Sequence, residues 1–425
     1  MRPSGVQVAG VIRRVGPLKT VGMCGLAVAS VVAASSLAEN WLADSASSAD
    51  AQRGSGRTAS ASADAPLGTV FTQHEGGPTI LARLDPVSLE PRGPQAVIAE
   101  YHDAWSFSPD GSKVALAISA PGQRARIGVR IVDLATMQTT ANLETGIAAE
   151  ALAWLSPRRL VALLQSGELV LVDPVAARIE RRRPLVGEIG CGLVRPALLT
   201  RHGMVLLLAG QGRSAARLVV IDERLRVRTA ALHRIETSGG CGWAGISVDR
   251  RGERASVLAG GAPLAEVDLR TMRVAYHPLG RWRSLPAGRW TVFTLPHRLL
   301  AAARLKGARS PGGVVVIDTR TWRRRLIDGR AGGVRFAGDR LLVFDGGVAT
   351  ARPRRGLGVR EYGLDGRPRG RTLPGQRVWD LQIAGRRAYA FGPAGMSTIV
   401  IGSGRVIATS KGSLDRIELL KRRDG

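Results

Sequence analysis

The sequence predicts an all-β fold, a β-propeller built from a repeated four-stranded unit. A short apolar run that ends in aspartate recurs six times, and the copies lie 40 to 50 residues apart. Two degenerate copies follow, around Gly363 and Gly402. Units of that length, each with room for four short strands, are typical of propeller blades. The six aspartates are Asp85, Asp133, Asp173, Asp222, Asp268 and Asp318.

Length and composition fit one repeat array better than several ordinary domains. Of the 425 residues, 53 are glycine and only 4% are aromatic, as many short strands joined by tight turns require. A repeat array can use the whole of such a chain as one structural unit.

The first 66 residues are expected to lie outside the propeller. Residues 1–20 carry four basic and no acidic side chains, and residues 21–38 are apolar or small. That order predicts a secretory signal over 1–38, although an uncleaved membrane anchor fits the same pattern. Residues 39–66 are mostly Ala, Ser, Asp and Gly and predict a disordered tether, which leaves 67–425 for the propeller.

One unit illustrates how a blade is encoded. His102–Ser108 is expected as the inner strand A, and a Pro-Asp-Gly turn follows it. Strands B, C and D are then expected at Lys113–Ser119, Ile127–Val132 and Gln138–Leu143. The same pattern places further units near 148–186, 194–232, 243–279, 289–328, 332–373 and 377–411.

The two ends of the repeat region complement each other. The first unit, 69–99, has room for strands B, C and D but not for A, and a strand-like run stands at 413–420. If this run supplies the missing strand, the ring closes and two exposed sheet edges disappear. The composite blade brings the count to eight, and seven stays open if one degenerate unit is a decorated loop.

The recurring aspartates are interpreted as turn-locking residues rather than catalytic carboxylates. An aspartate at the start of a turn accepts hydrogen bonds from the backbone N–H groups that follow it. Four copies add a hydroxyl three positions later that can serve the same turn, at Ser88, Thr136, Thr271 and Thr321.

Tryptophan recurs in the predicted A strands. We expect these side chains to pack between adjacent blades rather than to form a platform for carbohydrate. The residues are Trp105, Trp154, Trp290 and Trp379.

The segment FSPDGSKVALA, residues 107–117, resembles the repeat motif of TolB-like and WD40-like propellers, and units such as VVVIDTRT resemble the YVTN class of bacterial surface propellers. The resemblance is to a repeat pattern over residues 69–420. The YVTN tetrapeptide is absent, and the Trp-Asp ending of WD40 blades occurs only as Trp379-Asp380, in a predicted A strand. The resemblance implies the fold and little about activity.

Cys191 and Cys241 occupy equivalent places in adjacent units, just before an A strand. In an eightfold ring, equivalent points about 7 Å from the axis lie about 5.5 Å apart, which is the Cα separation that a disulfide needs. Export would place both residues in an oxidising compartment. A disulfide is therefore predicted, with two free buried thiols as the alternative.

Arginine dominates a formal charge of +27, and its clusters fall on the predicted D strands or beside them. The excess of arginine over lysine can reflect a GC-rich genome alone, without selection for any ligand. For the clusters, one interpretation is protection of exposed sheet edges, and the other is contact with an anionic surface. No base-reading helix or stacking module is apparent, so nucleic acid is not expected as a partner. The candidate contact residues are Arg181, Arg182, Arg183, Arg323, Arg324 and Arg325.

No catalytic, metal-binding or cofactor-binding motif is apparent, because the six histidines are scattered singly and GxSxG is absent. The sequence therefore predicts an exported, monomeric binding or scaffolding module at the cell envelope. Its expected partner is an envelope protein or an anionic envelope polymer or lipid. The alternative is an enzyme of hydrolase or lactonase type, with residues gathered at the mouth of the channel.

Overall fold

The structure is a computed structural model that describes residues 65–71, 79–99, 101–119, 127–185, 193–208, 215–235, 244–259, 263–279, 290–296, 298–304, 313–346, 356–410 and 417–420. The chain divides into two units, residues 1–60 and 61–425, and every described residue belongs to the second. The predicted signal segment, and all of the predicted tether except its last two residues, lie outside these ranges.

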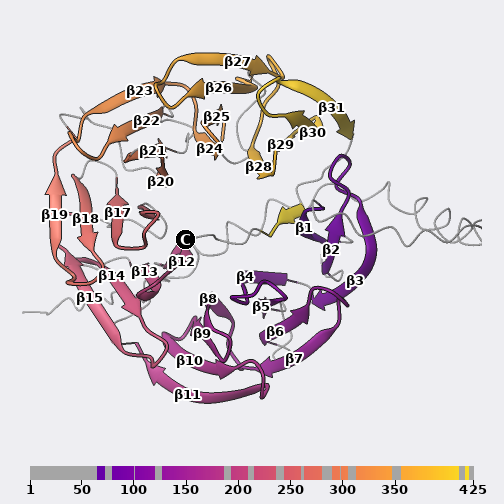
Figure 1. Cartoon of the computed structure of the whole chain (residues 1–425), viewed down its shortest axis with the longest axis vertical. Coiled ribbons are helices and arrows are strands. Elements are labelled where there is room, and N and C mark those ends of the chain that lie inside the picture. The colour runs from indigo at the N-terminus through magenta and orange to yellow at the C-terminus, as the bar shows by residue number, and fades with distance from the viewer. Residues whose placement is uncertain are drawn as a thin grey trace, which may run out of the picture. The chain divides into compact units, whose positions relative to one another are not determined.

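Within the described residues, 32 strands form eight antiparallel sheets of four strands each, arranged as the blades of a closed propeller (Figure 1). Each blade is numbered here from its inner to its outer strand. The eight-bladed prediction is confirmed, and the two degenerate repeats are complete blades, the seventh and the eighth.

The first four blades cover the described residues up to Leu232, together with the last strand of the chain. Blade 1 consists of β32 (Ile417–Leu419), β1 (Leu67–Phe71), β2 (Thr79–Leu84) and β3 (Pro91–Ala99). Blade 2 consists of β4 (Tyr101–Phe107), β5 (Lys113–Ser119), β6 (Gly128–Asp133) and β7 (Thr139–Glu144). Blade 3 consists of β8 (Ala149–Ser156), β9 (Arg159–Leu164), β10 (Glu168–Asp173) and β11 (Arg178–Pro184). Blade 4 consists of β12 (Leu193–Thr200), β13 (Gly203–Leu208), β14 (Ala216–Ile221) and β15 (Val227–Leu232).

The other four blades complete the ring. Blade 5 consists of β16 (Gly245–Val248), β17 (Arg254–Leu258), β18 (Leu264–Asp268) and β19 (Val274–His277). Blade 6 consists of β20 (Trp290–Leu295), β21 (Leu299–Arg304), β22 (Gly313–Asp318) and β23 (Arg324–Asp328). Blade 7 consists of β24 (Gly333–Ala337), β25 (Arg340–Phe344), β26 (Val359–Gly363) and β27 (Pro368–Thr372). Blade 8 consists of β28 (Asp380–Ala384), β29 (Arg387–Gly392), β30 (Gly395–Val400) and β31 (Arg405–Ser410).

The ring closes as predicted, because the last strand of the chain is the inner strand of blade 1. β32 pairs antiparallel with β1 over three positions, with Thr69 opposite Glu418 at the centre. The observed strand is shorter than the predicted run 413–420, and residues 413–416 lie outside the described part of the chain.

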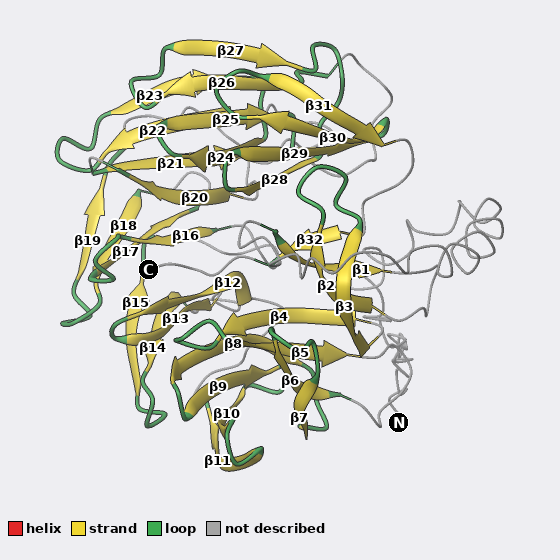
Figure 2. Ribbon diagram, turned by 45° about the vertical axis from the view of Figure 1, so that its right-hand side comes forward, coloured by secondary structure: helices red, strands yellow, loops and turns green. Residues whose placement is uncertain are grey.

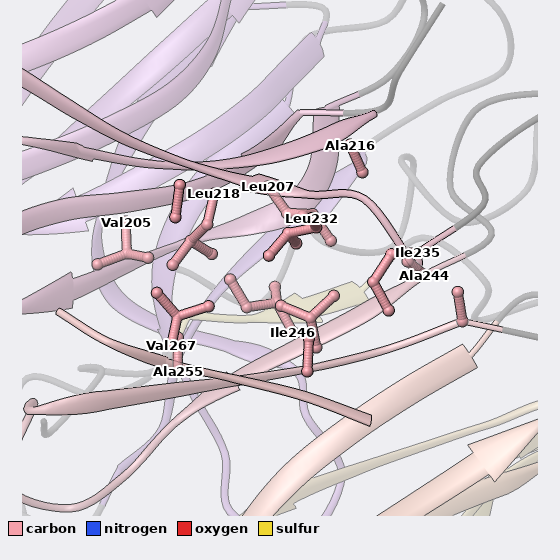
Figure 3. Packing of buried hydrophobic residues seen from close by; sticks show 14 of the residues in the cluster. Val205, Leu207, Ala216, Leu218, Leu232, Ile235, Ala244, Ile246, Ala255 and Val267 are labelled. Atoms are coloured by element: carbon pink, nitrogen blue, oxygen red, sulfur yellow. The ribbon is translucent and has the colours of Figure 1, made fainter. Parts of the chain in front are cut away.

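The hydrophobic core lies between blades, one cluster for each neighbouring pair around the ring. Figure 3 shows the cluster between blades 4 and 5, in which Leu207 and Leu218 face Ile246 and Val267. Both faces of each blade are therefore largely buried at its two middle strands. The two middle strands read as almost continuous apolar runs for this reason, and β13 is buried at all six positions.

The tryptophans meet the packing prediction only in part. Trp154 lies in the cluster between blades 2 and 3, and Trp105 packs against the cluster between blades 1 and 2. Trp379 is not in a strand, because the chain bends there and β28 begins one residue later, at Asp380. Trp290 is the first residue of β20.

All regular structure in the described residues is strand, as Figure 2 shows. Accordingly, the described part of the chain holds no apolar helix of membrane-spanning length.

Candidate functional site

The recurring aspartates lie at the turn between the third and fourth strand of blades 1 to 6. Asp133 is typical, since its Oδ1 accepts hydrogen bonds from the backbone N–H groups of Ala135 (3.0 Å) and Thr136 (2.9 Å). The Thr136 hydroxyl donates to the same oxygen at 3.0 Å. The backbone bond from Thr136, followed by its hydroxyl bond, holds the pKa of Asp133 below its ordinary value.

The other five aspartates accept backbone hydrogen bonds in the same way, two each at Asp85, Asp173, Asp222 and Asp268 and one at Asp318. The Thr271 hydroxyl donates to Asp268 as in the typical turn. The Thr136, Thr271 and Thr321 hydroxyls each also accept a bond from the N–H two residues later, at 3.4 Å.

These turns contain a feature that the sequence did not reveal. One residue after the hydroxyl position has a positive φ of 51 to 61° although it is not glycine. Except at Ala177, which is exposed, the side chain is buried or packs on the core, as for Leu89 and Met272, and this packing offsets the unfavourable backbone conformation. The residues are Leu89, Met137, Ala177, Met272 and Trp322, with Leu225 one position earlier in its turn.

Positive charge is concentrated on the outer strands. The eight outer strands carry eleven arginines and three acidic residues, whereas the eight inner strands carry two arginines and four acidic residues. We call the outer arginines the basic rim: Arg92, Arg178, Arg181, Arg182, Arg183, Arg228, Arg324, Arg325, Arg369, Arg371 and Arg405.

The three consecutive arginines of β11 have different environments. Arg182 forms an ion pair with Glu168 at 2.7 Å, and Arg183 donates to the carbonyl of Leu225 in blade 4 at 2.8 Å. Arg228 makes the equivalent bond from blade 4 to the Arg270 carbonyl in blade 5, also at 2.8 Å. Arg183 and Arg228 thus connect neighbouring blades, whereas Arg181 is exposed.

The arginines of the second cluster, Arg323 to Arg325, also have different environments. Arg323 ends the turn before β23, and Arg324 is half-buried, so that burial lowers the pKa of its guanidinium. Arg325 is exposed and lies against the next blade, where a Cβ on Gly366 would come within 2.9 Å of its Cδ.

A cleft opens at the rim between blades 3 and 4. It has a volume of about 490 Å³, and β9, β10 and β11 form one wall. The turn between β14 and β15 forms the other. We call it the rim cleft; its lining residues are Arg159, Leu171, Glu180, Arg181, Glu223 and Arg224.

Two buried carboxylates bridge neighbouring blades. Asp328 of blade 6 accepts from the Arg360 guanidinium of blade 7 at 2.7 Å and from the Tyr362 hydroxyl at 3.3 Å. Glu361 pairs with Arg340 at 3.0 Å and also accepts a bond from the backbone of blade 8. These acids have fixed basic partners, so the geometry assigns them to blade–blade contacts.

The histidines remain separate from one another in the described structure. His277 stacks on Trp322 with ring centroids 3.5 Å apart, and burial lowers its pKa. Within the described residues, no group of three His, Cys, Asp or Glu side chains is placed to hold a metal ion. Cys191 and Cys241, the candidate disulfide pair, lie outside the described residues.

No family model and no curated protein matches the chain. Among solved structures, it is similar to the dihydro-heme d1 dehydrogenase NirN in complex with DHE, at 15% identity and a TM-score of 0.55, over 87% of this chain and 76% of that one. It is also similar to BamB from Moraxella catarrhalis, at 16% identity and a TM-score of 0.51, over 79% and 91% of the two chains. A third similar structure is that of Saccharomyces cerevisiae Sqt1, at 11% identity and a TM-score of 0.51, over 73% of this chain and 85% of that one.

These likenesses, together with the eight closed blades, define the chain as a β-propeller protein. At such low identity they show the fold alone. The narrower resemblance to the YVTN and TolB-like classes has no support from the family models.

Proposed function

We propose that this protein is an exported propeller that binds an anionic component of the cell envelope through its basic rim. One observation carries the proposal, namely the excess of arginine over acidic residues on the outer strands and its reversal on the inner ones. Such a distribution attracts polyanions to the perimeter of the ring.

The arginines best placed for this contact lie on three successive outer strands, β23, β27 and β31 (Figure 1). Arg325, Arg371 and Arg405 are exposed, and none of them has a side-chain hydrogen bond or ion pair within the described structure. Leu326 and Val406 stand beside them and are also exposed, at 65% and 38%. Arginines interleaved with apolar side chains suit the surface of an anionic membrane or polymer.

The ligand chemistry that matches this surface is phosphate, either in lipid headgroups or in a wall polymer, because guanidinium binds phosphate oxygens bidentately. An extracytoplasmic location is part of the proposal and rests on the signal-like N-terminus. A monomeric state is proposed with it.

The test is binding of the purified protein to vesicles of phosphatidylglycerol and phosphatidylcholine, to vesicles of phosphatidylcholine alone, and to soluble polyphosphate. The triple variant Arg325→Gln/Arg371→Gln/Arg405→Gln should bind phosphate ligands about 100-fold more weakly, since each arginine near an anionic surface contributes about 1 kcal/mol. Binding should also weaken with added salt.

Arg158→Gln is the matched control, because Arg158 is exposed but lies in the turn between the two inner strands of blade 3. Preference for vesicles over polyphosphate would identify lipid as the source of the phosphate, and the reverse would identify a polymer. Equal binding to neutral and anionic vesicles, together with none to polyphosphate, would refute the proposal.

A further inference from the structure

The rim cleft between blades 3 and 4 has a rigid framework. Leu171 forms its apolar floor, and Arg181 stands opposite Leu171 in the β10–β11 pairing, so that both side chains face blade 4. Arg183, two residues on, holds the facing turn through the Leu225 carbonyl. The cleft is therefore fixed on both sides before any ligand arrives.

The facing turn is itself locked. Asp222 accepts hydrogen bonds from the backbone N–H groups of Arg224 and Arg226, both at 2.9 Å. Its second oxygen accepts from Nε of Arg226 at 2.7 Å. This locked backbone fixes where the side chains of Glu223 and Arg224 leave the turn, at the opening of the cleft.

Several charges in the cleft have no partner. Arg159 is paired with Glu180. In contrast, the side chains of Arg181, Arg224 and Glu223 form no hydrogen bond or ion pair within the described structure. Two guanidinium groups on opposite walls are thus available to a ligand, with one free carboxylate beside them.

The sum of these charges selects the ligand. Three arginines and two glutamates give the lining a formal charge of +1, which one carboxylate neutralises. A doubly charged phosphate would meet repulsion from Glu180 and Glu223. Leu171 can pack against the methylene groups of an acidic side chain, and Glu223 can accept from a peptide N–H.

We propose that the rim cleft binds an acidic side chain of an extended peptide segment from a protein partner, with Arg181 and Arg224 holding its carboxylate. This goes beyond envelope binding by the exposed arginines of β23, β27 and β31, because Arg181, although it also lies on the basic rim, would bind a protein. It adds a second site on the other side of the ring, so that the propeller can join a protein to the envelope surface.

The test measures fluorescence anisotropy of two labelled peptides on the full chain, Glu-Val-Glu-Val-Glu and its neutral analogue Gln-Val-Gln-Val-Gln. The acidic peptide should bind more tightly. Arg181→Gln/Arg224→Gln should weaken its binding at least about 10-fold, because two charge-assisted hydrogen bonds are lost. Glu223→Gln should strengthen its binding, since a like charge leaves the cleft.

The triple variant Arg325→Gln/Arg371→Gln/Arg405→Gln changes β23, β27 and β31. It should leave peptide binding unchanged while it weakens vesicle binding. Failure of the proposed rim function therefore leaves this test intact. Equal affinity for the two peptides, or an unchanged acidic-peptide affinity in Arg181→Gln/Arg224→Gln, would overturn the inference. The inference would also be overturned if inorganic phosphate displaced the peptide at a lower concentration than acetate does. If the double variant does not fold, Glu223→Gln and the neutral peptide decide the matter.

Discussion

Gln382 is expected to control closure of the ring. Its strand, β28, lies in blade 8, next to the strand β32 that completes blade 1. The Gln382 Nε2 donates to the Ile417 carbonyl at 2.9 Å, and its Oε1 accepts from the Leu419 N–H at 2.7 Å. The side-chain amide therefore binds the free edge of β32 as the backbone of another strand would.

Gln382→Ala removes both bonds and leaves a carbonyl and an N–H group without partners in residues that are 6% and 5% exposed. Each buried group left unsatisfied costs about 1 to 3 kcal/mol. Gln382 is itself only half-buried, and water can replace part of the loss. We therefore expect a decrease of about 2 to 3 kcal/mol in the free energy of unfolding, out of about 5 to 15 kcal/mol for a typical protein.

The assay is urea unfolding followed by tryptophan fluorescence. Gln165→Ala is the control, because Gln165 is exposed and bonds within the described structure only through its backbone. Gln382→Glu keeps the acceptor for Leu419 but removes Nε2, which donates to the Ile417 carbonyl and also to Asp380 at 3.3 Å, so it should lower the free energy of unfolding as well. If Gln382→Ala unfolds within about 0.5 kcal/mol of the wild type, as a neutral surface change does, the clamp has no role in closure.

Three further predictions concern one turn within blade 1 and two contacts between blades. Asp85→Ala should lower stability by about 1 to 2 kcal/mol in thermal melts, because two N–H groups of its turn lose their acceptor. Burial raises the pKa of Asp85, but the backbone hydrogen bonds from Ser88 and Val87 outweigh it, so the pKa lies below its ordinary value. The contribution of Asp85 to the free energy of unfolding should therefore be present above about pH 4 and lost on acidification. Burial raises the pKa of Tyr389 to about 12. The contribution of Tyr389 to the free energy of unfolding should therefore be present below about pH 10 and be lost toward pH 12, and Tyr389→Phe should abolish that loss. Arg183→Met should cost about 1 kcal/mol, whereas an unchanged urea midpoint would mean that its bond to Leu225 contributes nothing.

Local patterns explain why so much of the fold was predictable. The C–D turns depend on an aspartate and on N–H groups two and three residues away, as at Asp133, so the signal and its structural effect lie in one short segment. The sequence signal of the middle strands is equally local. Because these strands are buried on both faces, five or six consecutive residues are apolar, as in β9. Even ring closure was visible, because the first unit lacked one strand and the tail supplied one.

The functional surface was predictable only as a set of arginines. Arg181, Arg182 and Arg183 are indistinguishable in the sequence, yet one lines a cleft, one pairs with Glu168 and one binds a carbonyl 42 residues away. The positive φ of residues such as Leu89 also escaped detection, because burial against a neighbouring blade outweighs its local backbone preference.

The sequence by itself determined the repeat, the number of strands in each blade and the strand that seals the ring, because each depends on neighbouring residues or on a simple count. Only the tertiary structure decided which charges stay free, where the rim cleft opens and that Gln382 clamps the last strand. Those features depend on contacts between side chains of different blades. The separation of two residues in the sequence does not tell whether their side chains form such a contact.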